Sequence, residues 1–160
     1  MQGPRIIHSQ EKHFIGMHLN MSLSENKTFE LWKRFMPRRK ELEVHLGNEL
    51  FSIDVYPEDY FKAYDPSLVF QKWAAVEVAI GYTFPEGMEA LTTPEGLYAA
   101  FVHKGLASEG AKTYQYIFNV WLPQSKYQLD ERPHFAVMGD KYKNDDPNSE
   151  EEIWVPVVEK

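Results

Sequence analysis

The sequence contains no cysteine among its 160 residues. This absence excludes disulfide bonds, zinc sites built from thiolates and catalysis by a thiol nucleophile. Long apolar runs are missing too: no stretch approaches the ~18 apolar residues of a membrane span, and the N-terminal segment MQGPRIIHSQEKHF lacks the apolar core of a signal peptide. We therefore expect a cytoplasmic protein that does not enter a membrane.

Positive charge is scarce relative to negative charge. The chain has 24 acidic and 17 basic residues, a formal net charge of −7. This balance disfavours nucleic acid or an anionic membrane as the main partner and is compatible with cationic ligands. The basic segment KRFMPRRK, residues 33–40, has two interpretations. We favour a solvated helix face, and the alternative is a patch for an acidic partner.

Several catalytic and cofactor motifs are also missing. There is no Walker A loop, GxSxG elbow, HExxH motif or Gly-rich dinucleotide fingerprint. The six histidines show no ligand spacing on a shared face, and His13 and His18 fall on opposite sides of a strand. We expect neither a metal nor a cofactor, and spacing alone identifies no catalytic pair.

Aromatic residues are plentiful, with 10 Phe, 9 Tyr and 4 Trp. They indicate either a tightly packed core or a pocket lined by aromatic rings. The length fits one domain, expected to span residues 1–160.

Alternation and turn residues predict seven strands. They cover Arg5–Ser9, His13–Met21, Glu49–Tyr56, Trp73–Tyr82, Leu97–Lys104, His134–Tyr142 and Glu152–Val158. The Gly/Pro/Thr-rich segment 85–96 is expected to be a loop.

Two helices are expected between these strands. The first runs from Asn26 or Thr28 to about Leu46, with a kink or restart at Pro37. The second runs from a cap at Ser108 to about Leu122. The apolar side of the first helix is predicted to contain Phe29, Trp32, Phe35, Met36, Leu42 and Leu46.

The order strand, helix, strand, strand occurs twice, in pseudo-repeats of about 1–85 and 95–160. Hairpin spacing predicts an α+β fold, in which duplicated β-α-β-β units form a curved, mostly antiparallel sheet with two main helices. A groove between the two halves is a natural ligand site.

The C-terminal hairpin supplies candidate groove residues. Alternation places His134, Ala136 and Met138 on one face of their strand, opposite Phe135 and Val137. In the following strand Trp154 lies on one face, and Ile153 and Val155 lie on the other. We expect Trp154, Met138 and His134 to share a face that borders a groove.

Glu77 is a carboxylate in the middle of the apolar strand WAAVEVAIGY, on the same side as Ala75 and Ala79. A charge on a packed face costs free energy unless it is paired. Glu77 therefore faces a cavity or water, or it is an ordinary solvent-exposed strand glutamate.

The segments FELWKRFMPRRKEL, WAAVEVAIGY, GLYAAFVHKG, IFNVWLPQSKYQLDERPHF and EEIWVPV together resemble the GyrI-like small-molecule-binding domain. This domain is also known as the effector-binding domain of AraC-type transcription activators and multidrug-sensing regulators. The resemblance covers nearly the whole chain. It implies an aromatic-lined cleft that accepts lipophilic, often cationic, compounds. Regulators join the domain to a helix-turn-helix module, for which no residues remain here, so we expect a free-standing member.

The resemblance also implies site residues. Family members that bind cations have a pocket glutamate where this chain has Ala136, and the residue two positions on, Met138, lines the same wall. Trp154 matches an aromatic wall position, and Trp121 matches the family's Trp-Leu-Pro. The residues themselves add Glu77 as a substitute acid and Tyr98 as a nearby tyrosine. The predicted ligand-binding residues are Glu77, Tyr98, Trp121, Ala136, Met138 and Trp154.

Three functions remain open on this evidence. We favour a binding module for hydrophobic or cationic small molecules, with no direct nucleic acid binding. The first alternative is a hydrolase of small electrophilic compounds that uses Glu77 or Glu152 with Tyr98. The second is an inhibitor or partner of a topoisomerase or regulator protein, acting through the acidic surface or residues 33–40.

Overall fold

The computed structural model describes residues 3–42, 46–106, 109–139, 141–143 and 146–160. Its strands are β1 (Arg5–Ser9), β2 (Lys12–Met21), β3 (Leu50–Val55), β4 (Phe70–Val78), β5 (Glu89–Thr93), β6 (Gly96–Lys104), β7 (Tyr127–Leu129), β8 (His134–Met138) and β9 (Glu150–Glu159). Its helical segments are α1 (Thr28–Phe35), the 3₁₀ turn η1 (Met36–Glu41), α2 (Gly110–Tyr116), the π-turn η3 (Ile117–Trp121) and α3 (Leu122–Gln124).

The sheet has the order β1-β6-β9-β8-β3-β4-β2-β5, and every pair of neighbours is antiparallel. From its middle, where β3 pairs with β8, the order on one side repeats that on the other: β3-β4-β2 matches β8-β9-β6. Each half also contributes one main helix. The predicted α+β fold with a curved antiparallel sheet is therefore confirmed.

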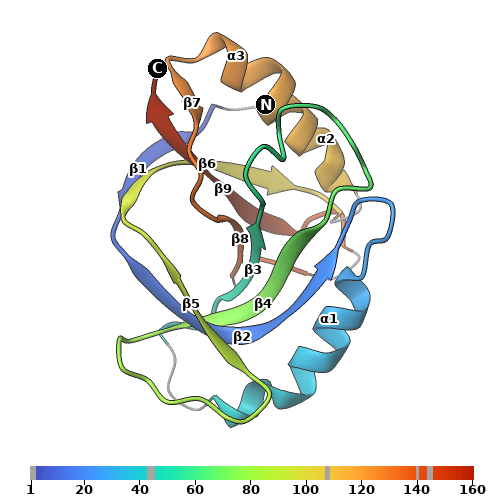
Figure 1. Cartoon of the computed structure of the whole chain (residues 1–160), viewed down its shortest axis with the longest axis vertical. Coiled ribbons are helices and arrows are strands. Elements are labelled where there is room, and N and C mark those ends of the chain that lie inside the picture. The colour runs from blue at the N-terminus through green and yellow to red at the C-terminus, as the bar shows by residue number, and fades with distance from the viewer. Residues whose placement is uncertain (1–2, 43–45, 107–108, 140, 144–145) are drawn as a thin grey trace.

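The two ends of the sheet meet, so that the strands form a ring (Figure 1). Only Gln10 and Glu11 separate β1 from β2, and only Pro94 and Glu95 separate β5 from β6. β1 and β2 thus follow one another as one bent strand, and β5 and β6 as another. Because β1 pairs with β6 and β2 pairs with β5, the two bent strands form one ladder that closes the ring. The prediction of a loop across residues 85–96 was wrong at β5, whose pairing with β2 and β-branched threonines outweigh the Gly and Pro residues on either side.

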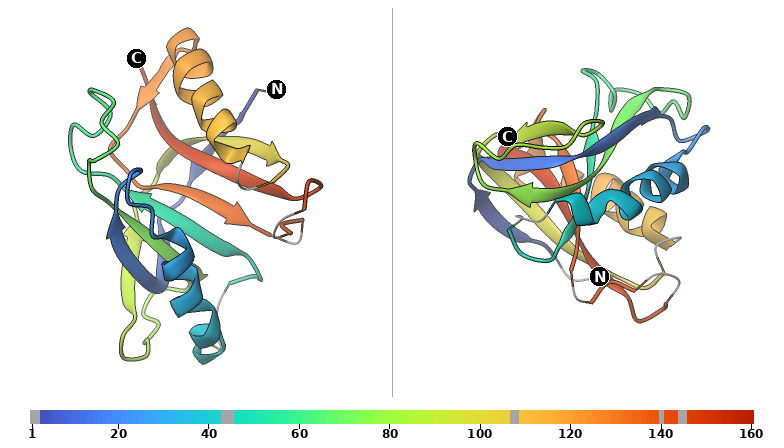
Figure 2. Two further views of the ribbon diagram at one scale, coloured as in Figure 1. Left: turned by 90° about the vertical axis from the view of Figure 1, so that its right-hand side faces the viewer. Right: turned by 90° about the horizontal axis from the view of Figure 1, so that it is seen from below.

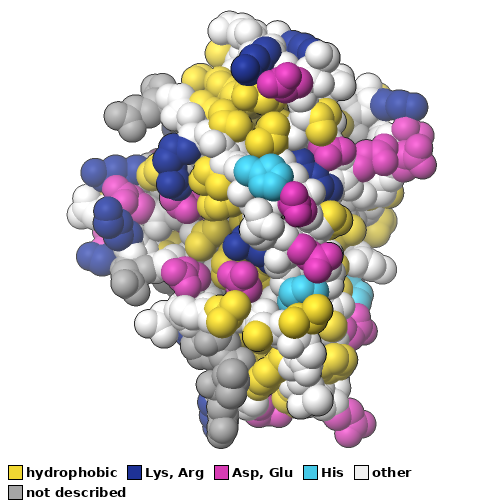
Figure 3. All heavy atoms as spheres, turned by 90° about the vertical axis from the view of Figure 1, so that its left-hand side faces the viewer, with side chains coloured by type: hydrophobic (Ala, Val, Ile, Leu, Met, Phe, Trp, Pro, Cys, Tyr) yellow, Lys and Arg dark blue, Asp and Glu magenta, His cyan; other side chains and the backbone are white. Residues whose placement is uncertain are grey.

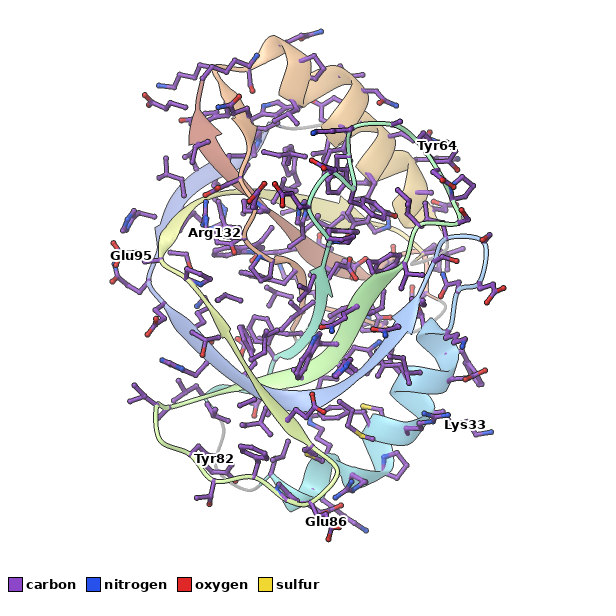
Figure 4. The ribbon with its side chains drawn as sticks, viewed as in Figure 1. Lys33, Tyr64, Tyr82, Glu86, Glu95 and Arg132 are labelled. Carbon is purple, nitrogen blue, oxygen red and sulfur yellow. The ribbon has the colours of Figure 1, made fainter. Side chains whose placement is uncertain are left out.

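The sheet has two differently occupied faces. Side chains fill the inside of the ring (Figure 4). The strand register puts Phe14, Phe51, Trp73 and Phe135 on one face of the sheet, and they belong to one buried cluster, which we call the ring interior. The opposite face carries both helices, with β3 and β8 between them (Figure 2). Leu31 and Phe35 of α1 pack on β2 and β4, and Ile117 packs on β6 and β9. On the side away from the helices, histidine and acidic side chains lie together (Figure 3).

The first helix is shorter than predicted and the second helical segment extends to Gln124, and the two prolines explain part of this difference. A proline has no N–H to donate and disturbs the preceding helical turn. The chain accordingly changes from α1 to the 3₁₀ turn η1 at Met36, next to Pro37, which confirms the predicted break. Pro123 does not end the second helical segment, because it occupies the first turn of α3, where proline is tolerated. Ser108, the predicted cap, lies outside the described residues.

Candidate ligand-binding site

A group of aromatic and ionisable side chains lies over β3 and β8, on the face that carries the helices. We call Asp54, Tyr56, Phe61, Tyr114, Phe118 and His134 the inter-helix cluster. Asp54 of β3 pairs with His134 of β8 on one side and with Lys72 of β4 on the other. Tyr114 and Phe118 come from α2 and η3, and Phe61 comes from the loop between β3 and β4.

Aromatic rings surround Tyr56. Its ring centroid lies 4.5 Å from that of Tyr60, 4.8 Å from Phe61, 5.2 Å from Phe70 and 4.9 Å from His134. Phe61 in turn stacks on both Phe118 and His134, with centroid distances of 5.3 and 5.4 Å. The cluster therefore presents several ring faces to one small volume.

Asp54 is the buried charge in this cluster, only 7% exposed. Tyr56 donates a hydrogen bond to Asp54 Oδ2 over 3.3 Å. Lys72 Nζ lies 3.2 Å from Oδ1, an ion-pair distance. Oδ1 nevertheless has no hydrogen-bond partner among the described residues, so the lysine supplies charge without hydrogen-bond geometry. A buried acceptor of this kind favours a ligand that brings a donor or a positive charge.

A second carboxyl group, Glu151, borders the cluster. It lies in β9 opposite the buried His103 of β6. Burial raises the pKa of the Glu151 carboxyl, and the charges of His103 and Lys72 lower it in part. Burial also raises the pKa of Tyr114, as do the charges of Asp54 and Glu151. Since both carboxyl groups act on the same phenol, the site combines two acids with a hydroxyl that stays protonated.

His134 occupies the centre of the ring contacts as a neutral side chain. Burial, together with the nearby charge of Arg132, lowers its pKa to about 3. It is 6% exposed. The cluster therefore presents an uncharged imidazole where the sequence alone shows only a titratable residue.

Two of the six predicted site residues lie on this same face. Ala136 is buried in β8 between Ser52 and Ile153. Met138, at the end of β8, is half-buried and pairs with Leu50. Both are therefore near the floor of the inter-helix cluster, on the strand that carries His134.

Three other predicted residues lie on the opposite face. Trp154 pairs with Phe135 and stacks on its ring at 5.2 Å, so it belongs to the ring interior. The expectation that Trp154 shares a face with Met138 and His134 was wrong, because that register puts Trp154 on one side of the sheet and both other residues on the opposite side. Tyr98 is fully buried in the ring interior and donates to the Pro133 carbonyl over 2.8 Å. Burial raises its pKa to about 12.

Glu77 also lies on the interior face, where Lys12 Nζ is 3.5 Å from its carboxylate. Trp121 packs elsewhere, against Phe101 and Tyr127 at centroid distances of 5.2 and 6.1 Å. The six residues thus lie in three different places. As ligand contacts they stay predictions.

Asp54, Tyr56, Tyr114 and Glu151 were missed by the sequence reasoning. A signal for the first two was present in LFSIDVY, where Phe51, Ile53 and Val55 alternate with Ser52, Asp54 and Tyr56. A carboxylate in the middle of an apolar strand is the criterion that selected Glu77, and it applies equally to Asp54.

In the part of the chain that the structure describes, no three His, Asp or Glu side chains are placed to hold a metal ion. None of its described helices is both long and apolar enough to span a membrane.

Comparison with known proteins places the chain in a family. It is 28% identical over 154 residues to the transcriptional regulator BrlR of Pseudomonas aeruginosa, covering 96% of this chain and 54% of BrlR. The chain thus spans about half the length of this curated relative.

Two solved structures have the same fold. SAV2435 bound to tetraphenylphosphonium has a TM-score of 0.70 at 13% identity, over 99% of this chain and 94% of that one. The C-terminal domain of EcmrR has a TM-score of 0.70 at 14% identity, with both chains fully covered. The model of the GyrI-like small molecule binding domain matches residues 2–158. The chain therefore belongs to the GyrI-like small molecule binding domain family.

Proposed function

We propose that this chain binds small lipophilic cations in the inter-helix cluster and acts as a ligand-sensing or sequestering module. The observation that carries the proposal is the buried Asp54 carboxylate, whose Oδ1 lacks a hydrogen bond within the described residues. Each aromatic face attracts a cation by about 0.5–2 kcal/mol. A poorly solvated carboxylate adds charge complementarity without demanding one ligand shape.

Phe61 suggests how a ligand ring fits. Its ring stacks on Phe118 and on His134, yet it is 44% exposed and belongs to a surface loop. An aromatic ligand that replaced this ring would make the same two stacking contacts. The ligand class is therefore a cation carrying at least one aromatic ring. Tetraphenylphosphonium, the ligand in the SAV2435 structure, belongs to this class and is a suitable probe.

Calorimetric titration with tetraphenylphosphonium tests the proposal. We expect saturable binding by the wild-type chain and at least about tenfold weaker binding by Asp54→Asn, because tenfold corresponds to about 1.4 kcal/mol, the scale of one charge-assisted contact. Tetraphenylborate has nearly the same shape and the opposite charge, so it should bind more weakly than the cation.

Asp59→Asn is the matched control, since it removes the same charge from an exposed position in the following loop. Equal losses in the two variants would mean that only overall charge matters. Trp154→Ala tests the ring interior in the same assay. Loss of binding there, with Asp54→Asn unaffected, would place the ligand on the opposite face and contradict the proposal.

Hydrolysis of small electrophiles is a second candidate, favoured by Glu151. A carboxyl group whose pKa is raised by burial can donate a proton to a leaving group. The charge of Asp54 acts on the same tyrosine, Tyr114, as that of Glu151, so we assign Asp54 the role of orienting the attacking water molecule. With styrene oxide as substrate, Glu151→Gln should abolish diol formation, while Glu152→Gln, its neighbour on the opposite face, should not. Absence of diol at high enzyme concentration would rule this candidate out.

A further inference from the structure

A separate cavity of about 250 Å³ lies beside the last residues of β2 and β3 and the first residues of β4. Its strand residues are Asn20, Gln71 and Val55, which are cross-strand neighbours: Gln71 pairs with Asn20 on one side and with Val55 on the other. Trp73 alternates onto the same face two residues from Gln71. This cavity therefore opens on the face opposite Asp54 and the inter-helix cluster.

The loop between β3 and β4 forms the rest of the wall. Pro57 and Val69 lie near the two ends of this loop, and Val69 is 55% exposed. The rings of Tyr56 and Phe70 lie 5.2 Å apart and also line the cavity. Tyr56 is a member of the inter-helix cluster, so these rings form the wall between the cavity and the rest of that cluster. The apolar part of the wall is thus built from two valines, a proline and two aromatic rings.

Two carboxamides supply the polar part of the wall. The indole N–H of Trp73 donates to Gln71 Oε1 over 3.2 Å. Because an indole N–H is only a donor, the amide oxygen must face it, which leaves the Gln71 NH₂ group pointing elsewhere. Asn20, the cross-strand neighbour of Gln71, is exposed, so its carboxamide is open to the cavity and to solvent. The two carboxamides offer donors and an acceptor to whatever fills the cavity.

Among the residues that the structure describes, no charged side chain lines this cavity. An ion moved from water to such a wall has no counter-charge to offset its desolvation. From the paired carboxamides, the apolar walls and the absence of charge, we propose that the cavity is a second binding site, for neutral lactams or amides with a compact apolar ring. Its volume of about 250 Å³ lies below the ~300–1,000 Å³ typical of ligand pockets, which limits it to small compounds.

Nuclear magnetic resonance titration with 2-quinolinone, a neutral bicyclic lactam, tests this site. The side-chain amide resonances of Asn20 and Gln71, assigned from Asn20→Ala and Gln71→Ala, should shift in a saturable way. Val69→Trp fills the cavity and should weaken binding at least about tenfold. Val120→Trp is the matched control at another exposed valine and should bind like the wild type.

Charge and location are then checked separately. The cation 1-methylquinolinium and the anion quinoline-2-carboxylate should shift the same two amide groups at least about tenfold more weakly. Saturating tetraphenylphosphonium should leave the 2-quinolinone shifts of both amide groups unchanged, so failure of the inter-helix proposal leaves this one standing. The proposal is overturned if 2-quinolinone shifts neither amide group, if Val69→Trp binds it like the wild type, or if tetraphenylphosphonium displaces it.

Discussion

Acidification from about pH 6.5 to pH 3 should destabilise the folded chain through His134 by up to about 5 kcal/mol. Burial lowers the pKa of this histidine from 6.5 to about 3. Within that window the unfolded chain binds a proton at His134 and the folded chain does not. The stabilisation is therefore complete above pH 6.5 and is lost as the pH falls toward 3.

Urea denaturation of the wild type and of His134→Phe, at several pH values in this window, measures the effect. The phenyl ring keeps the stacking partner of Phe61 and cannot take up a proton, so the variant should lose much less stability on acidification. The exposed His8, replaced by Gln, is the control and should show the wild-type profile. If all three proteins have parallel pH profiles, His134 is not the neutral buried group described above.

Truncation of Phe14 should be the most damaging single change in the ring interior. Its side chain is 0% exposed, and its ring lies 4.9 Å from Phe51 and 6.3 Å from Phe135. One ring thus joins β2, β3 and β8 across the inside of the sheet. We expect Phe14→Ala to cost about 3–5 kcal/mol of unfolding free energy, the range found for buried Phe→Ala substitutions.

Phe29→Ala is the matched control, because it removes the same atoms from a side chain that is 79% exposed. We expect a change within about 0.5 kcal/mol. Chemical denaturation of both variants gives the comparison directly. A Phe14→Ala loss as small as that of Phe29→Ala would contradict the description of a packed ring interior.

The order of the main strands and helices, without β5 and β7, could be predicted from the sequence because it depends on local periodicity and turn residues. The sequence did not predict which residues of β8 and β9 lie on the same face of the sheet. Alternation shows which side chains of one strand lie together, but a shift of one residue between strands exchanges their faces. The long connection before β9 does not set that register, so Trp154 was placed on the face of Met138 instead of that of Phe135.

Phe29 and Asp54 illustrate two further limits. A helical wheel assumes a known axis and packing direction. It correctly placed Phe35 on the apolar side, but it also placed Phe29 there, although the helix buries Leu31 and leaves Phe29 exposed. Asp54 was visible as a mid-strand carboxylate. Its importance depends on Tyr114 and Glu151, which are distant in sequence and meet it only after β3, β4, β8 and β9 have assembled.

The closed ring of strands also constrains the course of folding. Arg5, near the start of the chain, pairs with Ala100, and Lys12 pairs with Thr93. During synthesis the first strands therefore emerge long before their partners exist. Contacts of such high sequence separation slow folding, and an unpaired strand edge can join another chain in the meantime. The same ladder that leaves few free edges in the finished protein makes its N-terminal half the part most exposed to aggregation while the chain is incomplete.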